Sequence, residues 1–145
     1  MKKVAGIDPS LVQTGVAGVD GRLHTIKTGK LRGVERLAFL EAQLLPHILA
    51  ADLVVIEGQS FNARGRSHFS LAELHGVLHL ACFKSHVETV VVPPATLKKW
   101  ATGDGRATKD QMLEAARQKG ADPANYDEAD SYHLRAYGVS LSASS

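Results

Sequence analysis

The sequence contains a single cysteine, Cys82, which excludes an internal disulfide and is typical of proteins from a reducing compartment. No apolar run approaches the roughly eighteen residues that span a bilayer. The first residues, Met1-Lys2-Lys3, are not followed by a signal-type hydrophobic stretch. The excess of positive over negative charge is also small, because the formal net charge is only +2. Such a weak excess of cations is compatible with nucleic-acid binding only if the charge is clustered.

The chain has 145 residues, of which 44% are hydrophobic and 22% charged, as in an ordinary globular protein. This length suits one domain with one core. We assign residues 1–139 to that domain and expect the Ser-rich segment 140–145 to be a disordered tail. The sequence contains no internal repeat, and we expect no second domain.

Apolar runs separated by turn residues predict a meander of three antiparallel strands, at 4–7, 15–19 and 23–28. The continuously apolar run 52–57 predicts a buried parallel strand, and residues 88–92 predict a fifth strand. Helical spacing predicts helices over 33–51, 68–86, 95–101, 109–119 and 126–138. Pro46 should kink or divide the first helix. The predicted fold is therefore α/β, with a five-stranded mixed sheet flanked by helices.

Two carboxylates lie at the carboxyl ends of predicted strands, where such sheets collect functional groups. Asp8 ends the first strand and Glu57 ends the fourth, so they stand side by side if these strands are neighbours. Considered without the rest of the chain, an Asp before Pro9-Ser10 is more often an Asx-type turn residue than a residue that faces a cation.

The last helix carries Asp127 and Asp130, three residues apart and therefore on one helix face. Asp127 and Glu128 also suit the start of a helix, and Glu128 has the spacing of a capping box with Asn125. Four ionised carboxylates in one place need raised pKa values or a cation. Ligands that are all carboxylates favour Mg²⁺ or Mn²⁺ over zinc.

Taken together, these motifs resemble the RuvC family of Holliday-junction resolvases, which has the ribonuclease H-like fold. The resemblance rests on GIDPS and TG around Asp8, on DLVVI before Glu57, and on DEADSYHLRAYG, which carries Asp127 and Asp130. The helix LAELHGVLHLACF is similar to the family's long central helix. The segment VPPATLKKWATGDGRATKDQM is similar to its strand, short helix and Lys-containing loop. The resemblance covers nearly the whole chain, whose size resembles a bacteriophage-type member.

The resemblance implies an endonuclease that binds four-way DNA junctions as a homodimer and cuts two opposing strands, leaving 5′-phosphate ends. Asp8, Glu57, Asp127 and Asp130 would hold two Mg²⁺ ions, with Mn²⁺ as a substitute, and Lys109 would complete the catalytic set. Such an enzyme acts in the cytoplasm of a bacterial or phage-infected cell, with no membrane partner.

The resemblance also suggests DNA contacts. Lys98, Lys99 and Arg106 would form a basic strip on the phosphates, which makes binding depend on salt. Phe61, flanked by Arg64 and Arg66, would wedge into the junction core and stack on opened bases. The plainer alternatives are a solvated Lys109 in the first turn of its helix and a Phe61 folded onto the protein. His133 either touches the second metal or its water, contacts one of the metal's ligands, or is exposed.

Other functions stay open at this point. A branched-DNA or flap endonuclease of broader specificity would use the same carboxylates, and a catalytically silent nucleic-acid-binding relative is a further alternative. Asp8 to Gly15 also resembles the phosphate loop of actin-like kinases, but this chain is too short for the second lobe. His75, His79, Cys82 and His86 lie at helical spacing, and one helix cannot surround a zinc ion with four ligands. A polar flank of a dimer-forming helix is the better interpretation.

Overall fold

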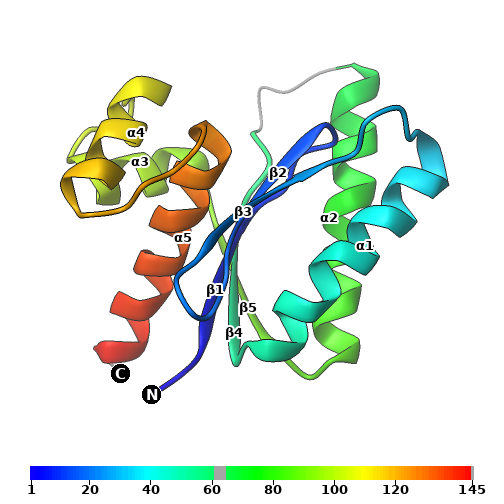
Figure 1. Ribbon diagram of the computed structural model, residues 1–145, viewed down its shortest axis with the longest axis horizontal. Coiled ribbons are helices and arrows are strands. Elements are labelled where there is room, and N and C mark those ends of the chain that lie inside the picture. Colours follow the sequence, from blue (N-terminus) through cyan, green and yellow to red (C-terminus); the bar gives the residue numbers. More distant parts are fainter. Residues whose placement is uncertain (61–64, 145) are drawn as a thin grey trace.

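The structure is a computed structural model that describes residues 1–60 and 65–144, except the side chains of Arg66 and Ser67. Its centre is a five-stranded sheet in the order β3-β2-β1-β4-β5 (Figure 1). The strands are β1 (Val4–Asp8), β2 (Gln13–Ala17), β3 (Leu23–Lys27), β4 (Leu53–Glu57) and β5 (Glu88–Val92). The first three form the predicted antiparallel meander, and β4 and β5 continue the sheet in parallel with β1. The predicted mixed sheet is confirmed.

Helices cover both faces of this sheet (Figure 1). One face carries α1 (Gly33–Ala50) and α2 (Arg66–Lys84), and the other carries α3 (Pro94–Thr102), α4 (Lys109–Gln118) and α5 (Tyr126–Ala143). Side chains alternate between the two faces along each strand, so that Ala5 and Ile7 join the core beneath α1 and α2, whereas Val4 joins the core beneath α5. The sheet is thus buried on both sides, as its apolar strands predict.

α1 continues through Pro46, so this proline does not divide the helix, and the fully buried Leu44 and Ile48 anchor the chain on both sides of it. One helix prediction is wrong in detail. α5 does not end at Gly138 but continues to Ala143, so residues 140–143 are helical rather than part of a disordered tail. Gly138 serves packing instead: a Cβ there would lie 2.5 Å from Cγ2 of Val55.

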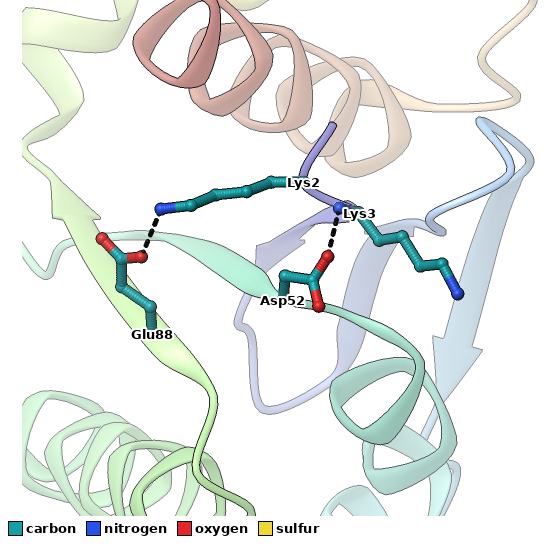
Figure 2. Close-up of polar contacts among 4 residues, drawn as sticks. All are labelled: Lys2, Lys3, Asp52 and Glu88. Carbon is teal, nitrogen blue, oxygen red and sulfur yellow. Dashed lines mark hydrogen bonds and ion pairs between the residues drawn. The ribbon is translucent and has the colours of Figure 1, made fainter. Parts of the chain in front are cut away.

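At the edge where the parallel strands begin, polar contacts tie the residues before β1 to the starts of β4 and β5 (Figure 2). The Lys3 amide donates to Oδ2 of Asp52 at 2.8 Å, and Nζ of Lys2 donates to Oε2 of Glu88 at 2.7 Å. Both side chains of the Lys2–Glu88 pair are about half exposed, and such pairs contribute only about 0–1 kcal/mol. The ladder of backbone bonds therefore sets the register, which pairs Ile7 with Ile56 and brings the following residues, Asp8 and Glu57, to the opposite edge side by side.

Among the residues that the structure describes, no helix is both long and apolar enough to cross a membrane.

Candidate active site

Glycines let α5 lie directly on the strands that carry the site. A Cβ at Gly15 would come within 2.1 Å of the Asp127 carbonyl oxygen, and one at Gly6 within 2.4 Å of the Ser131 carbonyl oxygen. Real Cβ atoms do not tolerate such distances, so bare backbone is required at both positions. Gly15 pairs with Asp8 across β1 and β2, which places the first turns of α5 over the end of β1.

The start of α5 is fixed by hydrogen bonds that orient its acidic face. Asn125 is the N-cap, as predicted, and its Oδ1 accepts from the Glu128 amide at 2.9 Å. The buried Glu128 carboxylate accepts from the Ala124 amide at 3.0 Å and from the hydroxyl of Thr25 on β3. Glu128 thus ties α5 to the edge strand, which supports its interpretation as a helix-start residue, although its side chain reaches Ala124 rather than Asn125.

The structure brings the four predicted carboxylates together. Asp8 is only 9% exposed, and its pKa is raised well above the usual range, first by burial and then by the charges of Glu57, Asp130 and Asp127. Burial, followed by the charge of Asp130, raises the pKa of Glu57 to about 8. Burial, followed by the charge of Asp127, raises the pKa of Asp130 to about 6. These acids come from β1, β4 and α5, which are far apart in sequence.

The donor set fits an oxygen-preferring divalent cation. Over residues 1–60 and 65–144, no three His, Cys, Asp or Glu side chains stand ready-spaced around one ion position. However, the four acids that meet here offer only carboxylate oxygens, and neighbouring carboxylates oppose the ionisation of Asp8, Glu57 and Asp130. A cation bound among them would replace protons as the compensating charge.

Two lysines border the acids. A cavity of about 120 Å³ is lined by Glu57, Asp130, Lys98 and Lys109, with Pro94 and Met112. Although burial raises the pKa of Glu57 and Asp130, the charge of Lys98 offsets part of the rise at both acids, and the charge of Lys109 offsets part of it at Asp130. Lys98, predicted only as a phosphate contact, therefore borders the same acids as Lys109 does.

The rest of the predicted basic strip lies away from this cavity. Lys99 lines a separate groove with Trp100 and Tyr137 on the other side of α3. Arg106 is exposed in the loop before α4, where its amide donates to Oδ1 of Asp104 at 2.8 Å. The predicted wedge residue Phe61 and its neighbour Arg64 fall outside the described residues, as does the side chain of Arg66.

His133 is fully buried rather than exposed. Its Nε2 bonds to the Met112 carbonyl oxygen at 2.8 Å, and its Nδ1 is buried without a hydrogen-bond partner in the described structure. Burial lowers the pKa of this imidazole, which keeps it neutral, so Nε2 is the donor. His133 therefore joins α5 to α4.

Sequence reasoning missed Gln13. Its Nε2 donates to Oδ2 of Asp127 at 2.9 Å and so holds one carboxylate of the site from β2. Nothing in the sequence marks this glutamine, because the contact depends on how α5 is rotated over the sheet.

The predicted His/Cys stripe of α2 and the turn after it does not form one polar surface. Cys82 is fully buried in the core beneath α1 and α2, whereas His79 and His86 are exposed. The rings of His75 and His79 stack with their centroids 6.3 Å apart.

No family model matches this chain. In structure, it resembles the RuvC of Thermus thermophilus in complex with a Holliday junction substrate, with a TM-score of 0.78, 24% identity and coverage of 96% of this chain and 95% of that one. It also resembles the Fowlpox virus resolvase in complex with Holliday junction DNA, with a TM-score of 0.68, 16% identity and coverage of 97% and 99%. These likenesses support the ribonuclease H-like fold.

Some relatives found by sequence have a higher sequence identity than these two structures have. The crossover junction endodeoxyribonuclease RuvC of Caldicellulosiruptor saccharolyticus is 27% identical over 129 residues, which cover 79% of this chain and 76% of that protein. The RuvC of Anaeromyxobacter dehalogenans strain 2CP-1 is 33% identical over 141 residues, which cover 88% of this chain and 75% of that protein. The chain therefore belongs to the RuvC family of crossover junction endodeoxyribonucleases.

Proposed function

We propose that this protein is a metal-dependent endonuclease that resolves four-way DNA junctions by hydrolysing phosphodiester bonds in two opposing strands. The observation that carries this proposal is the convergence of Asp8, Glu57, Asp127 and Asp130 at one edge of the sheet, in a chain of the RuvC family. Two Mg²⁺ ions, replaceable by Mn²⁺, are the cations that best suit these ligands.

When bound, such a pair of cations supplies an activated water on one side of the phosphate and charge stabilisation on the other. The chain's own residues prepare the site for this chemistry. Asp8 and Glu57 are held by adjacent strands, so their separation is set by the sheet and not by flexible loops. Lys98 and Lys109 border the same cavity as Glu57 and Asp130, and their ammonium groups favour an incoming phosphate there.

We propose that the DNA is held by further contacts predicted from the sequence. Lys99 and Arg106 would contact phosphates outside the acidic cavity. Phe61, with Arg64 and Arg66, would stack on bases opened at the junction centre, a contribution of about 1–3 kcal/mol per base. The products would carry 5′-phosphate ends.

Two opposing cuts require two copies of the site, and α2 offers a surface for a second copy of this chain. Phe69, Leu80 and Phe83 are 71%, 50% and 78% exposed along this helix. Gly76 lies on the same helix, and a Cβ at this position would meet no described atom within 4 Å outside its own stretch of helix backbone, so another helix can approach closely. An exposed apolar patch on one helix suits a twofold symmetric dimer, in which the same patch of both copies meets.

The function is tested by incubating the purified protein with four-way, three-way, flap and linear duplex DNA, with and without Mg²⁺. Paired, symmetric nicks confined to the four-way junction are expected. Equal cutting of flaps would replace this proposal with a branched-DNA nuclease of broader specificity, and binding without cutting would indicate a silent relative.

Asp8→Asn should bind the junction like the wild type but cut it about 100-fold more slowly or worse, the loss typical of removing one electrostatic group from a catalytic centre. Asp122→Asn, at an exposed position in the loop before α5, is the matched control and should cut normally. Single-turnover cleavage and junction binding in EDTA give the two readouts. Normal cutting by Asp8→Asn would rule out its proposed place among the carboxylates.

A further inference from the structure

A second group of cations lies at the carboxyl end of the sheet, on the side away from Lys98 and Lys109. Lys27, Lys30, Arg32 and Arg36 fall within ten residues that contain one acid, Glu35, and we call these four the β3-side patch. Lys27, Lys30 and Arg32 are exposed, and Arg36 is half-buried. Within the described part of the chain, none of the four takes part in an ion pair.

The patch begins at the rim of the acidic site. Lys27 pairs directly with Gln13 across β3 and β2, and opposite residues in a sheet project from the same face. The Gln13 amide contacts Asp127 on that face, and Thr25, two residues before Lys27, contacts Glu128 there. Lys27 therefore stands next to the residue that holds one of the four carboxylates.

The remaining cations follow on a segment that is braced against the site. Thr28 is buried, its amide donates to the Val12 carbonyl oxygen at 3.1 Å, and its hydroxyl donates to that of Leu11 at 2.7 Å. These bonds hold the segment between β3 and α1 against the turn that follows Asp8 (Figure 1). Arg36 shares a small cavity with Leu11, and its buried Nε lacks a hydrogen-bond partner in the described structure.

The sheet order places cations on both sides of the acids. Asp8 and Glu57 end the central strands β1 and β4, Lys27 ends the edge strand β3, and Lys98 lies on α3, which follows the other edge strand, β5. Five strands at 4.7–4.9 Å spacing span about 19 Å. At about 3.4 Å per phosphate along one strand of DNA, this distance corresponds to roughly five or six nucleotides.

We infer that the β3-side patch is a second phosphate-binding surface, which holds the DNA backbone of the junction on the side of the cleavage site opposite Lys98 and Lys109. The inference rests on the proposed function and adds to it the path of the substrate across the sheet edge, from β5 over the carboxylates to β3. Unpaired cations beside a buried acidic site are suited to a polyanion that must approach carboxylates which repel it.

The test is the salt dependence of binding to a labelled four-way junction, measured by fluorescence anisotropy in EDTA so that no strand is cut. The double variant Lys27→Gln/Lys30→Gln should lower the slope of log K against log salt by about 1–2, since each lost phosphate contact contributes about 0.9. Its affinity at low salt should fall tenfold or more.

The matched control is Lys3→Gln/Lys84→Gln, which removes the same charge at the opposite edge of the sheet, where Nζ of Lys3 extends away from Asp52 and Glu88 (Figure 2). This control should keep the wild-type slope. A wild-type slope in Lys27→Gln/Lys30→Gln, or an equal drop in the control, would overturn the inference while wild-type cleavage in Mg²⁺ still upheld the proposed function. A wild type that neither binds nor cuts branched DNA would overturn both.

Discussion

At the scale of single residues, Asp8, Glu57 and Asp130 are weak acids because they are buried next to other carboxylates. Each has lost water and gained like charge, and both effects favour the protonated form. In the folded chain the pKa is about 6 for Asp130 and about 8 for Glu57. At pH values between the ordinary pKa of a carboxyl group and these raised values, the folded chain therefore binds more protons than the unfolded chain. Where the folded state holds the extra protons, stability falls as pH rises.

This linkage predicts how metal and pH act together. In EDTA, the melting temperature should decrease as pH rises from about 5 to about 8.5, through the raised pKa values of Asp130 and Glu57. Mg²⁺ should restore it strongly at the high end and little at the low end, because binding requires ionised ligands. Differential scanning fluorimetry at both pH values measures this.

Glu57→Gln removes the carboxyl group whose pKa is raised to about 8 and should flatten the pH dependence in EDTA. An equal gain from Mg²⁺ at both pH values would contradict the linkage.

Some of these residues could be placed in the site from the sequence, and others could not. Asp8 and Glu57 were predictable because an acid at the end of an apolar strand has a defined place in a parallel sheet. Gln13 and the position of Lys98 beside the acids were not, because they depend on how α5 and α3 are rotated over that sheet. The roles of Phe61, Arg64 and Arg66 stay predictions.

At the scale of elements, the site depends on the position of α5. It supplies Asp127 and Asp130, and it reaches the strand ends only because Gly6 and Gly15 leave room for its backbone. Sequence periodicity predicted the helix and its cap at Asn125 but placed its end at Gly138, since a glycine that admits a neighbouring strand looks like one that ends a helix.

Gly15→Ala should therefore damage the site from a position that carries no functional group. The added methyl meets the Asp127 carbonyl, so α5 must shift, at a cost of about 1–3 kcal/mol in the free energy of unfolding. A displacement of about 1 Å can slow cleavage about 100-fold. Urea unfolding and junction cleavage are the measurements.

Gly105→Ala provides the comparison, because the nearest atom to its Cβ, the Ala95 carbonyl oxygen, is an ordinary 3.5 Å away. It should change stability by less than about 0.5 kcal/mol. Equal stability of the two variants would show that α5 does not need bare backbone at Gly15.

At the scale of the whole molecule, the proposed function assigns partners to two faces. The carboxyl edge of the sheet presents acids between cations, and α2 presents Phe69, Leu80 and Phe83 to solvent. Large apolar side chains along one exposed helix are costly unless another surface covers them.

Phe83→Glu should convert the proposed dimer into a monomer, because it places a charge in the apolar interface. Sedimentation velocity should show the change in mass, and junction cleavage should change from paired cuts to uncoupled single nicks. Leu49→Glu is the matched control, since Leu49 is 62% exposed on α1 and should leave the dimer intact. A wild type that is monomeric at every concentration would exclude α2 as the interface.

The order of the elements along the chain has a consequence for biosynthesis. The ribosome makes β1 and β4 before α5, so a nascent chain that has emerged only as far as α4 lacks both Asp127 and Asp130. Such a chain holds Asp8 and Glu57 without the other two proposed metal ligands, and it should not cut DNA. The proposed site is therefore complete only after α5 has been made and has packed against Gly6 and Gly15.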